Sequence, residues 1–411
     1  MSGGLLAGLP GPGERRLAVR VTPDALRQIR GGSPWVYDGS IRSVSHDGAP
    51  GDLAVVFDDR RRFAAIGLWD PTSPIRLKVL HTGSPRTIDG TFWAERIAAA
   101  LDRRAGLVAD DETTAYRLLH GENDALPGFV ADRYDDTAVV KLYTPAWVPH
   151  LRAVVGALVD ATGVERVVLR LGRSVDDAFG LSDGTTIVGD APGGPIRFLE
   201  RGLAMEADVV RGQKTGHFLD QRDNRVLVRG MAAGADVLDV FASTGGFSLA
   251  AAAGGATSVH LIDQSPAALA TAERNLSRNR RLAEVRAWRV RTAVGDAFEV
   301  LQQLAERGEQ HDLVIVDPPS FASNRDAVDR ALAAYGRLTR LALAVTRRGG
   351  TLVQSSCSSR VSEERFAEAV LDAAGGARVD VEEIRRTGHA VDHPIGFEHG
   401  AYLKSLYLKV T

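Results

Sequence analysis

The chain of 411 residues lacks the features of a secreted, membrane-spanning or zinc-clustered protein. It has a single cysteine, Cys357, which excludes an internal disulfide framework and a cysteine-rich zinc site and is typical of a reducing cytoplasm. No apolar run approaches the ~18 residues that a membrane-spanning helix needs. Residues 1–16 lack the basic start and the apolar core of a signal peptide, so we interpret them as a disordered leader.

An excess of charge of either sign is also missing. Lysine and arginine total 50 and aspartate and glutamate total 52, which gives a net charge of −2. A balance this even provides no global attraction to nucleic acid, so any such binding must come from local patches. At ~100–200 residues per domain, the length predicts two or three domains, enough for an enzyme with an attached recognition module.

Three regions of the chain differ in their pattern. Residues 17–90 contain short alternating runs separated by turn residues, which predicts a small β domain. Residues 91–200 mix helical periodicity with strand-like runs and end in a stretch rich in glycine, aspartate and proline, which predicts a central α/β domain and a linker. Residues 201–411 alternate strands with helices, which predicts a doubly wound, mostly parallel sheet with an added hairpin strand.

Residues 236–263 have the pattern of a nucleotide-binding βαβ unit. An apolar strand is followed by a turn of small residues at 241–247, a small-residue helix and a second apolar strand that ends at Asp263. Gly245 has no Cβ, which we expect to let a flat ligand approach the backbone. The carboxylate of Asp263, at the end of the second strand, would accept hydrogen bonds from both hydroxyl groups of a ribose.

The turn itself indicates which ligand fits this unit. A dinucleotide site needs G-x-G-x-x-G, but the turn reads Phe241-Ala-Ser-Thr244-Gly245-Gly246 and lacks the first glycine. A ligand with a ribose but no phosphate, such as S-adenosylmethionine, fits better. A redox nucleotide and a purely structural βαβ unit are the alternatives.

Polar residues at other strand ends extend the candidate site. Asp296, with the backbone of Ala297, would hold an adenine amino group, and Asp317 would border the methyl-acceptor pocket in a turn that two prolines keep rigid. Lys214 and Arg222 could meet the methionyl carboxylate of the cofactor, or they could be salt-bridged surface residues. The complete set of candidate cofactor-binding residues is Lys214, Gln221, Arg222, Phe241, Thr244, Gly245, Asp263, Asp296, Ala297 and Asp317.

The single cysteine lies in a turn among four serines, after the next strand. A lone cysteine is usually a small buried apolar residue, but beside this pocket a thiolate could be stabilised. Carbon-5 of cytosine is not nucleophilic enough to take a methyl group until a thiolate adds at carbon-6. Asp317 would stabilise the charge that this addition creates. Cys357 and Asp317 are therefore the candidate catalytic residues, with packing as the alternative role of the thiol.

Several motifs together resemble those of the bacterial 23S ribosomal RNA cytosine-C5 methyltransferases that carry an N-terminal PUA domain. The resemblance covers nearly the whole chain after residue 17. Its motifs are residues 214–225, residues 241–247, Asp317-Pro-Pro-Ser-Phe, Ser356-Cys-Ser, and Asp392-His-Pro with Tyr402-Leu-Lys404. One departure is Ser320, where that family often has lysine.

This resemblance implies a domain order and a reaction. It implies a PUA-like RNA-binding domain over residues 17–90, a central α/β domain over 91–200 and a Rossmann-like methyltransferase domain over 201–411. The expected cofactor is S-adenosylmethionine, and the expected partner is 23S ribosomal RNA or a large-subunit precursor. A homodimer is a further candidate assembly, which the sequence does not test.

Three functions are therefore compared. The first is methylation of carbon-5 of a cytosine in 23S ribosomal RNA through a covalent Cys357 adduct. The second is methylation of guanine or another base nitrogen, which would use Asp317 without the thiol. The third is a non-catalytic RNA-binding factor in ribosome assembly, which has no chemical need for Gly245, Asp263 and Asp317.

Two basic segments are candidates for gripping phosphates. One is the cluster 60–62 in the β domain, and the other has six arginines in fourteen residues. Either could instead be a solvated surface. The six are Arg278, Arg280, Arg281, Arg286, Arg289 and Arg291.

Overall fold

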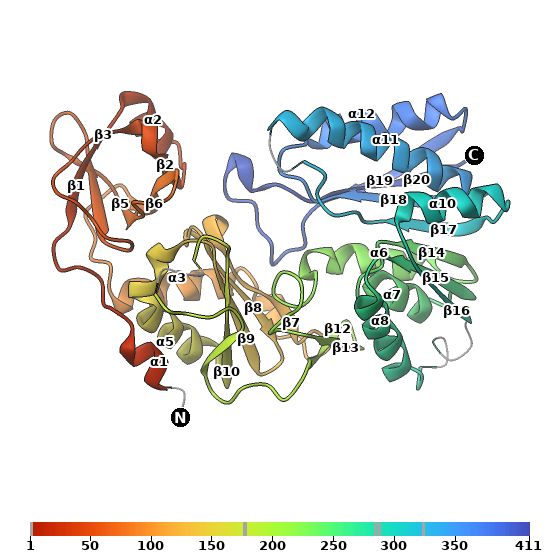
Figure 1. Cartoon of the computed structure of the whole chain (residues 1–411), viewed down its shortest axis with the longest axis horizontal. Coiled ribbons are helices and arrows are strands. Elements are labelled where there is room, and N and C mark those ends of the chain that lie inside the picture. Colours follow the sequence, from red (N-terminus) through yellow and green to blue (C-terminus); the bar gives the residue numbers. More distant parts are fainter. Residues whose placement is uncertain (1–2, 176–178, 283–284, 286–288, 323–324) are drawn as a thin grey trace. The chain divides into compact units, whose positions relative to one another are not determined.

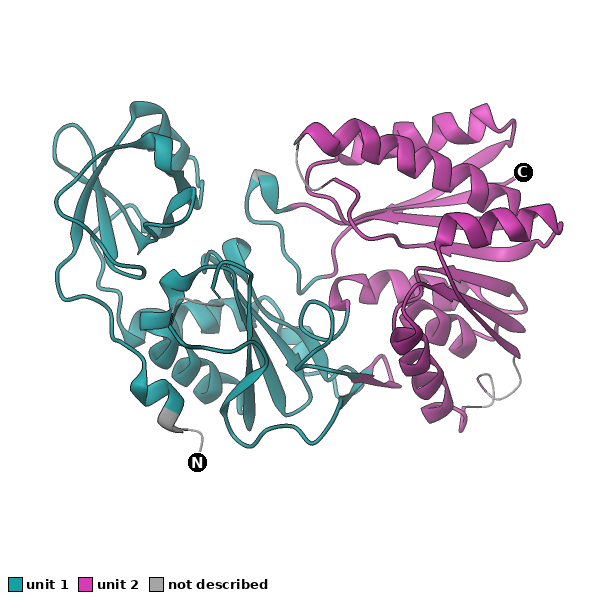
Figure 2. Cartoon of the chain, viewed as in Figure 1, with its two compact units in different colours: residues 1–199, 207–217, 391–400 teal, residues 200–206, 218–390, 401–411 magenta. Residues whose placement is uncertain are grey.

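The computed structural model describes residues 3–175, 179–282, 285, 289–322 and 325–411, and these form two compact units. Figure 2 colours unit 1 (residues 1–199, 207–217 and 391–400) and unit 2 (residues 200–206, 218–390 and 401–411). Each unit is therefore built from three stretches of sequence, a division that differs from the single boundary expected at residue 201. Among the described helices, none is long and apolar enough to cross a membrane.

Unit 1 begins with a six-stranded sheet in the order β2-β6-β5-β4-β1-β3 (Figure 1). Only β1 and β4 pair in parallel, and the other neighbours are antiparallel. The small β domain predicted for this region is confirmed. Its strands are β1 (Leu17–Val21), β2 (Trp35–Tyr37), β3 (Ile41–Val44), β4 (Leu53–Phe57), β5 (Phe63–Trp69) and β6 (Ile75–Thr82).

The sequence pattern did not predict the helix α2 (Pro23–Arg30) that packs on this sheet. Its N-cap is Thr22, whose hydroxyl accepts a hydrogen bond from the N–H of Ala25, and a proline occupies the first turn, where it costs no hydrogen bond. Ala25 and Ile29 are its buried residues. With only eight residues and a largely charged outer face, the helix has too short an apolar pattern to be recognised.

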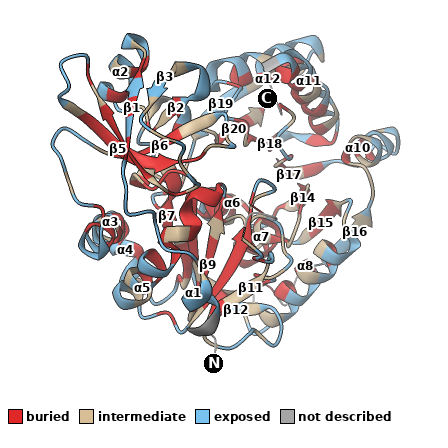
Figure 3. Cartoon of the chain, turned by 60° about the vertical axis from the view of Figure 1, so that its left-hand side comes forward, coloured by how far each residue is buried: buried red, intermediate tan, exposed pale blue. Residues whose placement is uncertain are grey.

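The central part of unit 1 is a five-stranded sheet in the order β11-β10-β9-β8-β7, with a core that contains Trp93, Phe129 and Trp147. Figure 3 shows β7 and β9 buried along most of their length. The strands are β7 (Ala115–His120), β8 (Phe129–Tyr134), β9 (Thr137–Leu142), β10 (Arg166–Leu171) and β11 (Thr185–Val188). The helices are α3 (Gly90–Asp102), α4 (Ala105–Val108) and α5 (Leu151–Thr162), with short 3-10 turns at Gly121–Asp124 and Pro145–His150.

Part of the expected leader is ordered. Residues Gly3–Gly8 form the short helix α1, so the prediction of disorder is wrong for this stretch. The Arg152 side chain donates hydrogen bonds to the carbonyl oxygens of Leu6 (2.8 Å) and Ala7 (2.6 Å), and Leu6 packs against the central core. The carbonyl groups at the C-terminal end of a helix have no partners within the helix, and Arg152 provides hydrogen bonds to two of them in α1.

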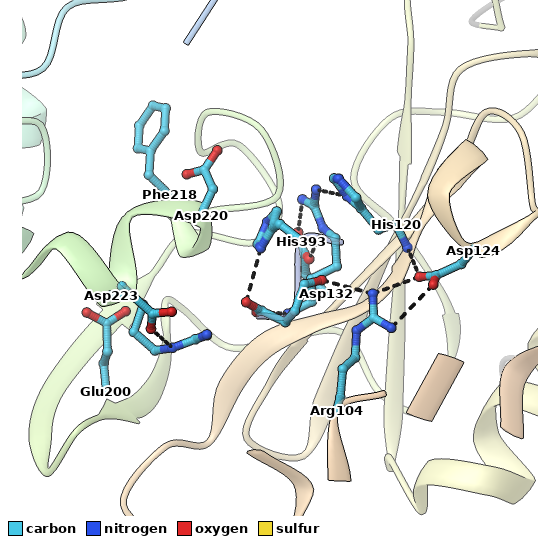
Figure 4. Close-up of polar contacts among 12 residues, drawn as sticks. Arg104, His120, Asp124, Asp132, Glu200, Phe218, Asp220, Asp223 and His393 are labelled. Atoms are coloured by element: carbon cyan, nitrogen blue, oxygen red, sulfur yellow. Dashed lines mark hydrogen bonds and ion pairs between the residues drawn. The ribbon is translucent and has the colours of Figure 1, made fainter. Parts of the chain in front are cut away.

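The segment 391–400 joins unit 1 through a buried polar network (Figure 4). Arg104, which is 1% exposed, donates to the carboxylate of Asp124 (2.7 Å) and to the backbone carbonyl of Asp392 (2.9 Å). The ring of His393 contacts the Asp392 carboxylate at 3.1 Å and stacks edge-on against His120. A buried arginine paired in this way is costly to disturb, because removing one partner leaves an uncompensated charge.

Unit 2 contains a seven-stranded sheet in the order β16-β15-β14-β17-β18-β20-β19. The first five strands are parallel, and β20 runs antiparallel to both β18 and β19, so the doubly wound sheet with an added hairpin is confirmed. Its strands are β14 (Asp236–Val240), β15 (Ser258–Asp263), β16 (Arg289–Val294), β17 (His311–Val316), β18 (Thr346–Ser356), β19 (Val381–Thr387) and β20 (Lys404–Val410). The strands β12 (Ile196–Glu200) and β13 (Leu203–Ala207) precede it.

Helices cover both faces of this sheet. One face packs against α6, α7 and α8 and the other against α10, α11 and α12, so the apolar strands are enclosed between two cores (Figure 1). The carboxyl ends of β14, β15, β17 and β18 consequently share one edge, where open α/β sheets bind ligands. The helices are α6 (Arg222–Met231), α7 (Gly246–Ala253), α8 (Pro266–Arg278), α10 (Ala297–Glu306), α11 (Val328–Ala344) and α12 (Glu363–Gly376).

Candidate active site

Every second residue of the turn after β14 has a left-handed backbone conformation. Phe241, Ser243 and Gly245 have φ angles of 64°, 49° and 76°. A Cβ at Gly245 would lie 2.6 Å from the Cβ of Ala272 on α8, and one at Gly246 would lie 2.9 Å from the Cδ of Arg225. Close approach of a ligand stays a prediction, and these contacts are an independent reason for both glycines. They are required because protein atoms fill the space and because Gly245 is left-handed.

A buried carboxylate holds the start of α7. Asp239 is 1% exposed, and its Oδ2 accepts hydrogen bonds from the N–H (3.0 Å) and the hydroxyl (2.6 Å) of Ser248. Burial raises the pKa of Asp239 to about 6, although the hydrogen bonds from Ser248 act in the opposite direction. The sequence pattern assigned this residue no ligand. Its contacts make it an anchor that fixes the helix to the end of β14.

Asp263 fixes the same turn from the neighbouring strand. Its Oδ2 accepts a hydrogen bond from the N–H of Ser243, and its Oδ1 accepts one from the N–H of Ser265, both at 2.8 Å. The carboxylate is half-buried, and each oxygen keeps a further lone pair for a hydroxyl group. The predicted contact with a ribose is compatible with this arrangement.

Asn275 holds the turn in place, and the sequence did not predict this role. Its Nδ2 donates to the carbonyl of Thr244 at 3.0 Å, and its Oδ1 accepts from the N–H of Glu206 at 2.9 Å. The side chain is fully buried on α8, between Ala272 and Leu276. An amide on the apolar face of a helix is the signal that could have identified it, because a buried amide needs partners.

Asp296 is first of all a helix cap. Its Oδ1 accepts hydrogen bonds from the N–H groups of Phe298 (2.9 Å) and Glu299 (3.3 Å), and its Oδ2 accepts one from Gln264 (3.0 Å). Ala297 is buried as the first residue of α10. Asp followed by a helix is a common N-cap, which explains the residue without a ligand. Contact of Asp296 and Ala297 with an adenine stays a prediction.

Asp317, after β17, is oriented by a buried amide network. The Gln221 side chain donates to the Asp317 carboxylate at 2.9 Å, and the Asn224 amide donates to the Gln221 carbonyl at 2.5 Å. Asn224 also donates to the hydroxyl of Ser405 on β20 at 3.2 Å. Gln221 was expected at the cofactor, and this role stays a prediction, because its partner Asp317 was itself predicted to serve both the cofactor and the acceptor.

Cys357 lies at the adjacent strand end. Its Sγ donates to the carbonyl of Pro318 at 3.7 Å, which joins the cysteine turn to the Asp317 turn. The thiol is half-buried. Burial raises the pKa of Tyr335 to about 12, and the negative charges of Cys357 and Asp317 act in the same direction. The structure therefore brings together the two residues predicted to be catalytic.

The two predicted cations are less simply placed. Arg222 is fully buried at the first position of α6, with its Nε 3.3 Å from the carboxylate of Asp223. Lys214 belongs to unit 1, where its carbonyl accepts a hydrogen bond from Lys141 at 3.3 Å. Unit 2 thus brings together Gln221, Arg222 and the strand-end residues, but it does not contain Lys214.

The described arginines of the dense basic segment are unequally engaged. Arg278 pairs with Glu206 and Arg291 with Glu309, whereas Arg281 and Arg289 are exposed. Arg286 lies outside the described residues. In the β domain, the carboxylate of Asp58 holds the turn at 60–62. It accepts hydrogen bonds from the backbone N–H groups of Arg60 and Arg62 and from the Arg62 side chain.

The chain matches known proteins in sequence and fold over nearly its whole length. Residues 118–379 match a family of S-adenosylmethionine-dependent methyltransferases, and residues 19–82 match a PUA-like domain. The chain superimposes on SMU.776, solved in complex with SAH, with a TM-score of 0.81 over 96% of this chain and all of that one, at 21% identity. The chain is therefore an S-adenosylmethionine-dependent methyltransferase with an N-terminal PUA-like domain.

Two curated relatives show which family of methyltransferases the chain belongs to. A ribosomal RNA large subunit methyltransferase of Deinococcus radiodurans is 45% identical and covers 98% of this chain and 99% of its own. A ribosomal RNA large subunit methyltransferase I of Shewanella frigidimarina is 33% identical and covers 96% of this chain and 99% of its own. The chain belongs to the ribosomal RNA large subunit methyltransferase family.

The residues of unit 2 fit the cofactor of this class. The carboxylate of Asp263 can accept from the two ribose hydroxyl groups, as a ribose ligand requires. The turn 241–247 contains no basic side chain, which suits a ligand without phosphate. S-Adenosylmethionine supplies an electrophilic methyl group to such a site.

Proposed function

We propose that this methyltransferase modifies carbon-5 of a cytosine in 23S ribosomal RNA, with Cys357 as the nucleophile. The relatives that it matches over almost their full length are named ribosomal RNA large subunit methyltransferases, which supports the substrate class. The observation that supports the chemistry is the contact between the Cys357 thiol and the Pro318 carbonyl, beside Asp317. A homodimer stays a prediction.

The residues have distinct roles in this reaction. The Cys357 thiolate adds to carbon-6 of the cytosine, and the electron pair of the ring double bond then makes carbon-5 nucleophilic. Asp317, oriented by Gln221, holds a proton taken from solvent against the ring nitrogen, and this proton neutralises the negative charge that the addition places there. After carbon-5 takes the methyl group, loss of its proton to solvent and expulsion of the thiolate restore the ring.

The remaining site residues serve the cofactor. Asp263 accepts hydrogen bonds from the ribose, Asp296 and Ala297 bind the adenine, and the turn after β14 lines the binding site. Gln221 acts through Asp317. The residues of unit 2 that we propose for cofactor binding are Arg222, Phe241, Thr244, Gly245, Asp263, Asp296 and Ala297, whereas Asp317 serves the acceptor base.

The decisive experiment compares ribosomal RNA from cells that lack the protein with RNA from cells that express wild type or Cys357→Ser. We expect mass analysis to find one 5-methylcytosine that disappears in the deletion strain and is not restored by the serine variant. RNA that contains 5-fluorocytosine should trap a covalent adduct with the wild-type protein only.

Two results would contradict the proposal. Full methylation by Cys357→Ser, with the methyl group on a ring or exocyclic nitrogen, would favour the base-nitrogen reaction, which uses Asp317 without the thiol. Unchanged ribosomal RNA in the deletion strain would favour a non-catalytic role in assembly. Calorimetric binding of S-adenosylmethionine to the serine variant serves as the control for its folding.

A further inference from the structure

Lys404, the first residue of β20, is a buried cation beside the cysteine turn. It pairs across the antiparallel ladder with Ser356, the residue that precedes Cys357, and it is 6% exposed. Its Nζ donates hydrogen bonds to the backbone carbonyls of Ser358 and Val361, which follow Cys357. Lys404 therefore contacts the chain both before and after the cysteine.

The partners of this lysine make its burial notable. Lysine is almost never fully buried without a paired charge, and an ammonium that loses water without one is costly. Among the described residues, no carboxylate lies within 4.0 Å of Nζ, and the two hydrogen bonds of the ammonium go to neutral carbonyl oxygens. Burial lowers the pKa of Lys404 to about 8, whereas the negative charges of Cys357 and Glu363 raise it.

A purely structural role does not explain why position 404 is a lysine and not a neutral hydrogen-bond donor. A neutral donor could hold two carbonyl oxygens at lower desolvation cost, because transfer of a charge from water is far more expensive than transfer of an amide. A positive charge in this position has one electrostatic use that a neutral donor lacks. It stabilises a negative charge on the neighbouring sulfur.

We propose that Lys404 is the counter-cation of Cys357, a positioning residue that keeps the thiol ionised and holds its turn in place. This inference rests on the proposed function only in taking the thiolate as the nucleophile. The proton of the thiol leaves to solvent, and Lys404 stays protonated. When the sulfur adds to a base, its charge moves into the ring and away from Lys404.

The other ionisable groups near the thiol do not stabilise a negative charge on the sulfur. They are Asp317 in the turn after β17, Tyr335 on α11, whose phenol is affected by the charges of both Cys357 and Asp317, and Glu363 at the start of α12, whose charge acts on Lys404. Two of these are acidic and oppose ionisation of the sulfur, and the phenol of Tyr335 is neutral at physiological pH because burial raises its pKa to about 12. Of the four groups, Lys404 alone favours the thiolate.

The chain has one cysteine, so alkylation by iodoacetamide reports on Cys357 alone. The experiment measures the alkylation rate of the full-length protein against pH for wild type, Lys404→Met, Lys404→Gln and Lys404→Arg. We expect the midpoint of the neutral variants to rise by roughly one to two pH units, the range for loss of an opposite charge close by. Lys404→Arg keeps the positive charge, so its midpoint should stay close to that of wild type. The glutamine variant keeps a donor for the turn and replaces the methionine variant if that one does not fold.

Lys409→Met is the matched control, because it removes the same charge from the same strand, and its midpoint should equal that of wild type. An unchanged midpoint in the neutral Lys404 variants would overturn the inference. Alkylation needs neither RNA nor cofactor, so its result is independent of the proposed reaction. A shifted midpoint with full methylation by Cys357→Ser would keep Lys404 as the counter-cation and reject the nucleophile. An unshifted midpoint with an inactive serine variant would reject Lys404 as the counter-cation and keep Cys357 as the nucleophile.

Discussion

The two sides of the candidate site hold their acidic residues in different ways. On the cofactor side, Asp239, Asp263 and Asp296 each accept hydrogen bonds from backbone N–H groups two to twenty residues away in sequence. On the acceptor side, Asp317 is held by the Gln221 side chain and Cys357 lies beside Lys404. The cofactor side is therefore defined by local backbone geometry, and the acceptor side by side chains from distant segments.

This difference has a consequence for substitution. A backbone donor is present whatever side chain its residue carries, so the cofactor side should tolerate changes around its carboxylates. The acceptor side should respond to changes at positions that contact neither cofactor nor RNA. The following expectations test this contrast, beginning with the largest effect.

Asp317→Asn should lower kcat by at least ~100-fold, the scale for removing one group that stabilises charge in a transition state. The affinity for S-adenosylmethionine, measured by calorimetry, should change little if the carboxylate serves the acceptor. A loss of cofactor affinity as large as the loss of kcat would move Asp317 to the cofactor side.

Asp239→Asn should change how stability depends on pH. The folded-state pKa, about 6, lies above the ordinary value of 3.8, so the folded protein binds more protons between these pH values. Stability should therefore fall by on the order of 2 to 3 kcal/mol as the pH rises from about 4 to about 6. Urea unfolding across this range should show that fall in wild type and its absence in the asparagine variant. An identical pH dependence in both proteins would contradict the role of Asp239.

Asp263→Ala should weaken cofactor binding by roughly ten-fold or more, the scale of hydrogen bonds to a charged group. Thermal unfolding without cofactor should stay close to that of wild type, because the N–H groups of Ser243 and Ser265 are near the surface and can bind water. Unchanged affinity by calorimetry would remove Asp263 from the ribose site.

Gln221→Leu should lower kcat by a few-fold to ~10-fold, since loss of a hydrogen bond to a charged group costs about 1.5 kcal/mol. Cofactor affinity should be unaffected, in contrast to the expectation for a direct cofactor ligand. A raised Kd for S-adenosylmethionine with normal kcat would return Gln221 to the cofactor side, where the sequence pattern placed it.

Replacing Arg280 and Arg281 together with alanine should have the smallest effect on the reaction. Phosphate contacts position RNA without specifying it, so binding to target and non-target RNA should weaken alike. The salt dependence of binding should flatten by up to about one unit of slope for each phosphate that is no longer neutralised. The same slope in the double variant would place the RNA surface elsewhere, with the exposed turn at 60–62 as the next candidate.

The contrast between the two sides also explains what the sequence could predict. The alternation of strands and helices predicted the sheet of unit 2, because each strand is apolar and each helix has the usual period. The carboxylates at the strand ends were visible for the same reason. The contact of Gln221 with Asp317 was not predicted, since 96 residues separate the two in sequence and only the packed fold reveals it.

Other misses have similar physical causes. The strands β7 and β8 were not recognised, because Arg117 and Asp132 interrupt their apolar runs and are compatible with burial only as an ion pair, at 2.7 Å. Gly245 was singled out for a ligand, but the contact that its missing Cβ allows is with Ala272, on a helix whose approach no local pattern encodes. Asn275 was overlooked because polarity on a helix is normally attributed to solvent.

The assignment of residues 391–400 to unit 1 has a consequence for synthesis of the protein. The hydrogen bond from Arg104 to the carbonyl of Asp392 joins residues 288 positions apart. At ~5–20 residues per second, the ribosome needs roughly 15 to 60 seconds to add that length of chain. Unit 1 therefore cannot reach its final form until translation is almost complete, and until then the Arg104 side chain has only its earlier-made partners. A chain truncated before residue 391 would lack part of unit 1 although its first 199 residues are intact.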